Sequence, residues 1–144
     1  MFIYENVQNV LKNDKGRTWE IMKEVWDSLG YELYYDILNA QDYGTPQLRR
    51  RLFLIGFRKD VIKGKTYHFP EKQELTRFAP SYLDTKVDKK YYLGKKGFEW
   101  VTTPSKNRRR SRYNQDIIGC QTANHQANWI GDFRIEPVQE WMRK

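Results

Sequence analysis

The segment RLFLIGF, residues 51–57, is the feature that most constrains how this chain can fold. Its apolar run is too short for a typical helix, is rich in strand-forming residues and is typical of a mostly buried β-strand. It follows a loop over residues 39–51 that contains Gly44 and Pro46 and ends in three consecutive arginines. A strand buried on both faces requires apolar layers on each side, so neighbouring segments must supply them.

The segments before this strand begin with a second strand and a helix. A strand is predicted where MFIYENV opens with a β-prone run, and a helix is predicted over residues 17–30. The apolar residues of the helix recur at helical spacing: Met22, Val25, Trp26 and Leu29. Gly30 stands where a glycine commonly ends a helix.

Residues 31–38 alternate in polarity, with Leu33, Tyr35 and Ile37 on one face, and predict a further strand. The order strand, helix, strand, long loop, strand indicates part of an α/β sheet. Three strands and one helix cannot cover both faces of a buried sheet. We therefore expect the remaining strands to come from another chain or an absent segment.

The pattern weakens beyond residue 60, and the charge changes with it. Residues 1–60 hold nine basic and nine acidic side chains, whereas residues 61–144 hold 17 and nine, so this region carries the whole net charge of +8. We expect one short helix within residues 81–100 and short strands within residues 117–135. A basic, aromatic-rich region indicates a polyanion partner, most often nucleic acid, and a merely solvated basic surface is the alternative.

Several classes of protein are disfavoured by the composition. No apolar run is long enough to span a membrane, and no secretory leader is recognisable, so a cytoplasmic protein is expected. Cys120 is the only cysteine, which excludes an internal disulfide, and we expect it to be buried and inert. With only His68 and His125 beside it, no metal site is expected.

Two motifs resemble those of a known family. Glu5-Asn6-Val7 follows the first predicted strand, and residues 38–51 spell Leu-Asn-Ala-x-Asp-Tyr-Gly-x-Pro-Gln-x-Arg-x-Arg. In this order they resemble the sixth and eighth motifs of DNA (cytosine-5) methyltransferases. The resemblance covers residues 1–58, and residues 61–144 fall where that family places its variable target-recognition domain.

The resemblance implies a fold and two domains. Residues 1–60 would form the later part of the catalytic domain, with a partial Rossmann-like methyltransferase sheet. Residues 61–144 would form a small, mixed, irregular β-containing target-recognition domain, which we expect to be incomplete at its end.

The resemblance also implies roles for three charged residues. In that family a cysteine thiolate adds to C6 of cytosine, and negative charge then develops toward N3 and O2 of the ring. Glu5 would protonate or hydrogen-bond N3, which is general acid catalysis. Arg51 would stabilise the charge at O2, with Arg49 supporting the same cluster.

Other residues are assigned to support or DNA contact. Asn6 would hold the motif loop, and Gln47 would order the approach to the arginines. Arg50, between the motif positions, would face away, toward solvent or phosphate. The expected DNA contacts are basic or amide side chains: Arg50, Arg108, Arg109, Arg110, Arg112, Asn124 and Gln126.

The implied reaction is transfer of a methyl group from S-adenosylmethionine to C5 of a flipped cytosine in double-stranded DNA, in the setting of bacterial restriction–modification. The glycine-rich cofactor loop and the nucleophilic Pro-Cys of the family have no counterpart in these residues. We therefore expect the chain to be inactive alone and a complementary amino-terminal methyltransferase chain to bind most of the cofactor.

Alternatives remain open at the level of sequence. The chain could be a split subunit, a truncated gene product or an engineered fragment. It could also be a stand-alone DNA-binding remnant without catalysis, or a degenerate fragment without a role.

Overall fold

The computed structural model describes residues 1–103, 112–120 and 131–135. The chain divides into two compact units. The first contains residues 1–44 and 49–75, and the second contains residues 45–48 together with the described residues from 76 onward. The chain therefore passes from the first unit to the second and back within the loop that precedes the predicted buried strand.

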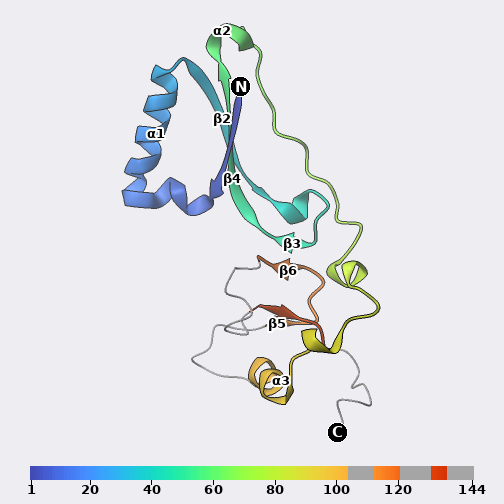
Figure 1. Cartoon of the computed structure of the whole chain (residues 1–144). Coiled ribbons are helices and arrows are strands. Elements are labelled where there is room, and N and C mark those ends of the chain that lie inside the picture. Colours follow the sequence, from blue (N-terminus) through green and yellow to red (C-terminus); the bar gives the residue numbers. More distant parts are fainter. Residues whose placement is uncertain (104–111, 121–130, 136–144) are drawn as a thin grey trace. The chain divides into compact units, whose positions relative to one another are not determined.

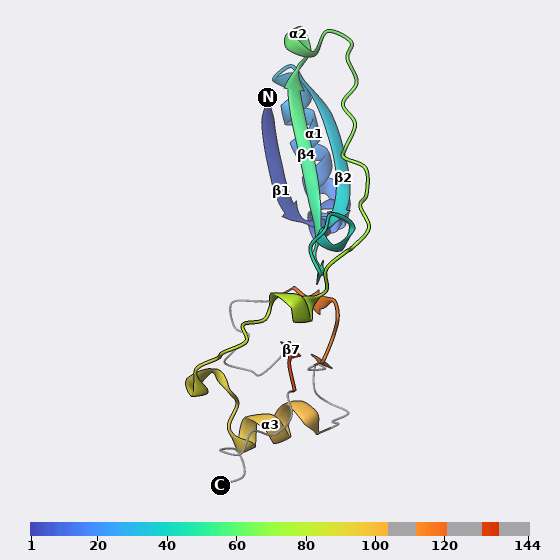
Figure 2. The same ribbon diagram turned by 90° about the vertical axis from the view of Figure 1, so that its right-hand side faces the viewer.

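The first unit is built on a three-stranded sheet. Its strands are β1 (Phe2–Val7), β2 (Tyr31–Asn39) and β4 (Arg50–Arg58), in the order β1-β4-β2. β4 is antiparallel to both neighbours. Two short 3₁₀ turns within Gln8–Gly16 and the helix α1 (Arg17–Ser28) connect β1 to β2, and α1 lies behind the sheet in Figure 2. The predicted α/β arrangement of strands and helix is confirmed.

The core lies between α1 and one face of this sheet. Leu52 and Leu54 of β4 are fully buried there and pack with Trp19 of α1. Gly56 continues the same face and leaves room for the ring of Phe2, which a Cβ at residue 56 would overlap. This packing explains why residues 51–57 combine apolar side chains with one glycine.

The helix meets the sheet through only part of the apolar set that the sequence indicated. Trp26 of that set packs on the sheet, whereas Val25 and Leu29 are exposed. Trp19 and Trp26 lie two turns apart and pack against aromatic rings of the strands, Trp19 against Tyr35 and Trp26 against those of β1. The large rings of the two tryptophans bury the most area and face the sheet, so the smaller apolar side chains Val25 and Leu29 lie on the outer side of the helix.

The predicted strand face over residues 31–38 is confirmed. Leu33 is paired with Gly56, Tyr35 with Leu54, and Ile37 with Leu52. All three therefore lie on the face that carries the core, as the alternation of polarity required.

The opposite face of the sheet is only partly covered. Tyr67 and Phe69, from the segment that runs on this side of the sheet after β4, form a ring cluster with Tyr34 and Phe57 (Figure 1). Ile3 lies on this face and is 62% exposed. One helix therefore covers one face, and the described residues cover the other only in part.

The first unit extends past the boundary expected at residue 60. After β4 comes the short helix α2 (Lys59–Ile62), and the chain then returns to the loop after β2. The backbone N–H of Gln73 donates to the carbonyl oxygen of Asp42 at 2.8 Å, and Lys72 Nζ lies 3.0 Å from Asp42 Oδ2. These contacts tie the segment to the first unit as far as Leu75.

The second unit has only short strands. β3 (Gln47–Leu48) pairs in parallel with β6 (Ile118–Gly119), and β5 (Arg112–Tyr113) pairs in parallel with β7 (Asp132–Phe133). Among its described residues the helical segments are two 3₁₀ turns and one helix: Ala79–Tyr82, Lys89–Tyr91 and α3 (Lys95–Thr102). The predicted short helix is α3, and β6 and β7 are among the predicted strands, whereas β3 lies inside the segment predicted as a loop.

A buried carboxylate joins the two strand pairs of the second unit. Arg112 NH2 donates to Asp132 Oδ2 at 2.9 Å, and the backbone N–H of Gly119 donates to the same oxygen. Asp132 Oδ1 lies 2.9 Å from Arg112 Nε without hydrogen-bond geometry, so this second contact is electrostatic. With few apolar side chains buried in this unit, a paired charge takes over part of the role of a core.

Across the described ranges, no helix has both the length and the apolar character needed to cross a bilayer.

Substituting Gly56 tests the packing of the first unit. We expect Gly56→Ala to lower the free energy of unfolding by about 1–3 kcal/mol, because the new methyl group would displace the Phe2 ring. The denaturation midpoint measured in urea checks this. Gly94→Ala is the matched control, since a Cβ at residue 94 meets no atom within 4 Å. Equal effects of the two substitutions would contradict the packing described.

Candidate active site

The sheet brings Glu5 and Arg51 together on the face opposite α1. Glu5 is paired with Phe53 and Val7 with Arg51 across β1 and β4, so the two charged residues are diagonal neighbours on one face. Arg51 Nε lies 3.0 Å from Glu5 Oε1, and Arg51 NH1 donates to the carbonyl oxygen of Arg50 at 2.9 Å. The Arg51 side chain is 18% exposed, so the guanidinium is held in one direction by the strand and by two polar contacts.

Arg49 joins this pair from just before β4. Its NH2 lies 3.8 Å from the same oxygen, Glu5 Oε1. Residues two apart in an extended chain share a face, which is why Arg49 and Arg51 both approach Glu5. The Glu5 side chain remains 42% exposed. The result is an accessible carboxylate flanked by two guanidinium groups, which can offer both hydrogen-bond donors and an acceptor to a polar ring.

Asn6 fixes the end of β1 from the other side of the sheet. Its Nδ2 donates to the hydroxyl of Tyr4, and its Oδ1 accepts from the backbone N–H of Val7 at 2.7 Å. Because Asn6 is paired with Leu52, it lies on the α1 face and not beside Glu5. Its position fits a structural role in holding the motif rather than contact with the cluster.

Arg50 lies between the two clustered arginines and is exposed, on the alternate side of the strand. Its charge acts on Asp42 in the preceding loop. The hydrogen bond from Lys72 is the largest cause that lowers the pKa of Asp42, and Arg50 is a smaller one. The orientation predicted for Arg50, away from the cluster, agrees with this position.

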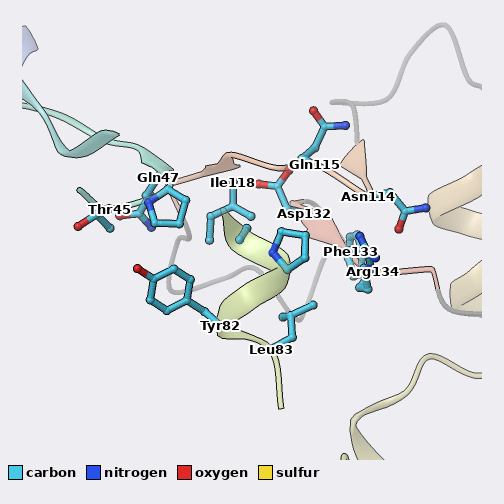
Figure 3. A pocket seen from close by; sticks show the side chains of 13 residues that line it. Thr45, Gln47, Tyr82, Leu83, Asn114, Gln115, Ile118, Asp132, Phe133 and Arg134 are labelled. Carbon is cyan, nitrogen blue, oxygen red and sulfur yellow. The ribbon is translucent and has the colours of Figure 1, made fainter. Parts of the chain in front are cut away.

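Gln47 belongs to the second unit, where it lines a cavity of about 420 Å³. Apolar side chains, among them Tyr82, Leu83 and Ile118, provide most of its wall (Figure 3). Thr45, Gln47, Asn114 and Gln115 add polar groups to this lining. The structure therefore groups Gln47 with residues of the second unit, although only two positions separate it from Arg49.

The remaining predicted DNA contacts lie mostly outside the described residues. Arg108, Arg109, Arg110, Asn124 and Gln126 fall there. Arg112 is described, and its guanidinium is engaged by Asp132, which gives it a structural role. DNA contact by these residues stays a prediction.

Cys120 differs from its expected environment. It was predicted to be buried, but it is exposed, in the position directly after β6. Within the described part of the chain, no group of three or more His, Cys, Asp or Glu side chains is arranged to hold a metal ion.

Sequence reasoning missed Asn39. It ends β2, is 7% exposed, and accepts a hydrogen bond from the backbone N–H of Arg49 at 3.0 Å through Oδ1. The available signal was a polar residue directly after an alternating strand and ten positions before a charged cluster.

A family model and individual known proteins that match this chain are all methyltransferases. The model described as C-5 cytosine-specific DNA methylase matches residues 1–141. The chain is 39% identical over 93 residues to the type II methyltransferase M.SsoII of Shigella sonnei, which covers 64% of this chain and 24% of that protein. It is 38% identical over 86 residues to the type II methyltransferase M.HhaI of Haemophilus parahaemolyticus, covering 58% and 26%.

A longer match is found in a phage protein. The orphan methyltransferase M.SPRI of Bacillus phage SPR is 27% identical over 150 residues, covering 85% of this chain and 34% of that protein. The matched part thus spans between about a quarter and a third of these relatives.

Solved structures of methyltransferases are similar in fold. A Spodoptera frugiperda DNMT2 mutant has a TM-score of 0.71 at 15% identity, covering 98% of this chain and 43% of that chain. The Entamoeba histolytica methyltransferase EhMeth has a TM-score of 0.65 at 16% identity, with the same coverage. At such identities the likeness concerns the fold.

The two ion pairs of Glu5 should differ in strength. Double-mutant cycles in urea with alanine substitutions should give a coupling of about 0.5–1 kcal/mol for Glu5 with Arg51 and less than about 0.3 kcal/mol for Glu5 with Arg49. The reason is the shorter distance and lower exposure of the Arg51 contact. A larger coupling for Arg49 would contradict the geometry.

Proposed function

The chain belongs to the C-5 cytosine-specific DNA methylase family, and on this basis we propose that it is the catalytic-support and target-recognition portion of a DNA cytosine-5 methyltransferase. The reaction is transfer of a methyl group from S-adenosylmethionine to C5 of a cytosine flipped out of double-stranded DNA. The type II names of several relatives support a setting in bacterial restriction–modification. The proposed location is the cytoplasm, where a bacterial chromosome lies.

One observation carries this proposal: the convergence of Arg49 and Arg51 on an accessible Glu5. When a thiolate adds to C6 of cytosine, electron density moves into the ring toward N3 and O2. In its protonated carboxylic acid form Glu5 donates a proton or hydrogen bond at N3, leaving the carboxylate that the arginines pair with, and Arg51 donates to O2. Arg51 suits this role because β4 fixes its direction and its charge does not depend on pH in the physiological range.

Arg49 has a supporting role in this scheme. Its guanidinium is farther from Glu5 and 40% exposed. It adds positive charge beside Glu5 and orients the carboxyl group, whereas Arg51 makes the contact with the ring. Removing Arg49 therefore costs less catalysis than removing Arg51.

The residues present do not fit the cofactor. β1 runs from Glu5-Asn6-Val7 directly into 3₁₀ turns, without a glycine-rich turn in that connection. The cavity of about 420 Å³ belongs to the second unit and has a mainly apolar lining. S-adenosylmethionine is thus held mainly by a complementary segment.

The complementary segment is an amino-terminal methyltransferase portion, which also supplies the nucleophilic cysteine. Two exposed apolar surfaces of the first unit support its docking. Ile3 and Val7 lie on the partly covered face of the sheet. Ile21 and Val25 of α1 and Leu29 directly after it follow one another at four-residue spacing. Together with it, the first unit forms part of a Rossmann-like methyltransferase sheet.

The second unit is the target-recognition portion and binds the DNA backbone through its excess positive charge. Arg50 of β4 contributes from the first unit, since it is exposed and directed away from Glu5. The further contacts proposed are Arg108, Arg109, Arg110, Arg112, Asn124 and Gln126.

Methyl transfer tests the assigned roles. The chain is mixed with an amino-terminal portion of a relative, labelled S-adenosylmethionine and double-stranded DNA. Arg51→Ala should lower kcat by about 10²–10³-fold, Glu5→Gln should lower it by about 10²–10⁴-fold, and Arg49→Ala should lower it less than Arg51→Ala does.

Arg58→Ala is the matched control for these substitutions. Arg58 ends the same strand and is ion-paired with Asp60, so its removal should leave kcat unchanged. Near-full activity of Arg51→Ala or Glu5→Gln would overturn the roles assigned here.

The dependence of DNA affinity on salt concentration tests whether the chain contacts the phosphate backbone. The chain alone should lose affinity steeply as salt rises, and Arg50→Ala should reduce the slope of log K against log salt by about 1. Arg58→Ala should leave the slope unchanged. A flat dependence would contradict phosphate contact, whereas a steep slope without methyl transfer in any mixture would favour the alternative, a DNA-binding remnant.

A further inference from the structure

We propose that Asn39 is a positioning residue for the charged cluster, acting through the backbone of Arg49. The proposal deepens the proposed function, because it explains how the arginine beside Glu5 is aimed, and it rests on that function. Asn39 touches neither Glu5 nor the expected ring, so its effect on catalysis has to pass through Arg49.

Both backbone polar groups of Arg49 are bound to the end of β2. Asn39 Oδ1 accepts from the Arg49 N–H at 3.0 Å, and the N–H of Ala40 donates to the Arg49 carbonyl oxygen at 3.1 Å. One of these bonds depends on a side chain and the other does not. The position of Arg49 is therefore sensitive to the identity of residue 39.

The side chain of Asn39 is unusual in its burial. It is buried, at 7% exposure, which is rare for a polar residue. A buried amide costs free energy unless it is hydrogen-bonded, and asparagine offers a neutral acceptor at the length needed here. Packing of the sheet by itself would require only an apolar side chain at residue 39. The buried acceptor is therefore explained by the backbone N–H of Arg49 that it binds.

Arg49 needs this anchor because regular strand pairing does not include it. The ladder between β2 and β4 ends with Asn39 opposite Arg50. On the other side of Arg49, residues 45–48 belong to the second unit. Asn39 therefore fixes the chain at the residue where it returns to the first unit, one position before the ladder begins.

The anchor at Asn39 determines the direction in which the Arg49 side chain points within the cluster. The Arg49 guanidinium lies 3.8 Å from Glu5 Oε1, a contact that a small rotation of the residue 49 backbone would lengthen. Arg51 is within the ladder and keeps its direction without Asn39. Loss of the Asn39 acceptor should thus remove the contribution of Arg49 to catalysis and leave that of Arg51.

The first test is kinetic and uses the reconstituted mixture described above. Asn39→Ala should lower kcat about as much as Arg49→Ala does, with the KM for DNA changed by less than a factor of two. In an Arg49→Ala background, Asn39→Ala should lower kcat by less than a further factor of two, since both changes remove one effect. The control is Asn13→Ala, which should not change kcat. Asn13 is an exposed asparagine of the first unit whose side chain donates a hydrogen bond to Thr18.

The outcome that overturns the proposal is additivity. If Asn39→Ala lowers kcat by the same factor with and without Arg49, Asn39 acts on the unit in general and does not position Arg49. Unchanged kcat in the Asn39→Ala variant would overturn it as well.

The second test needs no activity and uses the chain alone. Amide hydrogen exchange followed by NMR should show the Arg49 N–H exchanging at least about tenfold faster in Asn39→Ala, relative to the N–H groups of Leu52 and Leu54 in the same strand. Asn39→Asp, which keeps an acceptor at the same place, should restore the protection. Equal acceleration at all three residues, or none at Arg49, would overturn the proposal.

The two tests separate the two hypotheses. If the mixture with the unaltered chain transfers no methyl group, the proposed function fails, while hydrogen exchange still decides whether Asn39 holds Arg49.

Discussion

The burial of β4 between two antiparallel neighbours is the constraint on which the first unit depends. Leu52 and Leu54 are fully buried against α1, so the face of β4 that carries them must be the one directed toward the helix. Because side chains alternate along a strand, this burial sends Arg51 to the opposite face, where Glu5 of β1 meets it. A shift of the pairing by one residue would turn Arg51 toward Trp19 and expose the leucines, so the apolar core also fixes the register of the charged pair.

The rest of the cluster depends on how the chain enters β4. The loop from Asn39 onward leaves the first unit, contributes β3 to the second and returns at Arg49. Contacts with the first unit fix both ends of this loop. Asn39 and Ala40 bind the backbone of Arg49, and Lys72 and Gln73 bind Asp42. The position of Arg49 beside Glu5 is thus set partly by neutral hydrogen bonds to its backbone, at a distance from the carboxylate itself.

The two units are stabilised by different interactions. The first has an aromatic and aliphatic core beneath one face of its sheet, while exposed apolar side chains such as Ile3 on the other face and Leu29 directly after α1 offer surface for further protein. The second has two-residue strands and relies on Asp132, which binds Arg112 and the backbone of Gly119. A basic unit with a small core is suited to a role in which a polyanion supplies much of the interaction energy.

The sequence by itself determined the local elements, the α/β class and the family motifs, because these follow from short-range periodicity and from residue order. It placed Leu33, Tyr35 and Ile37 on one strand face and separated Arg50 from Arg49 and Arg51 by alternation alone. Tertiary structure decided what depends on contacts distant in sequence. Trp19 and Trp26, two turns apart on one face of α1, pack on the rings of the strands, and this choice of face leaves Val25 and Leu29 exposed. Pairing of Gln47 with Ile118 moved residues 45–48 into the second unit, and the buried amide of Asn39 acquired its partner only when the chain returned ten residues later.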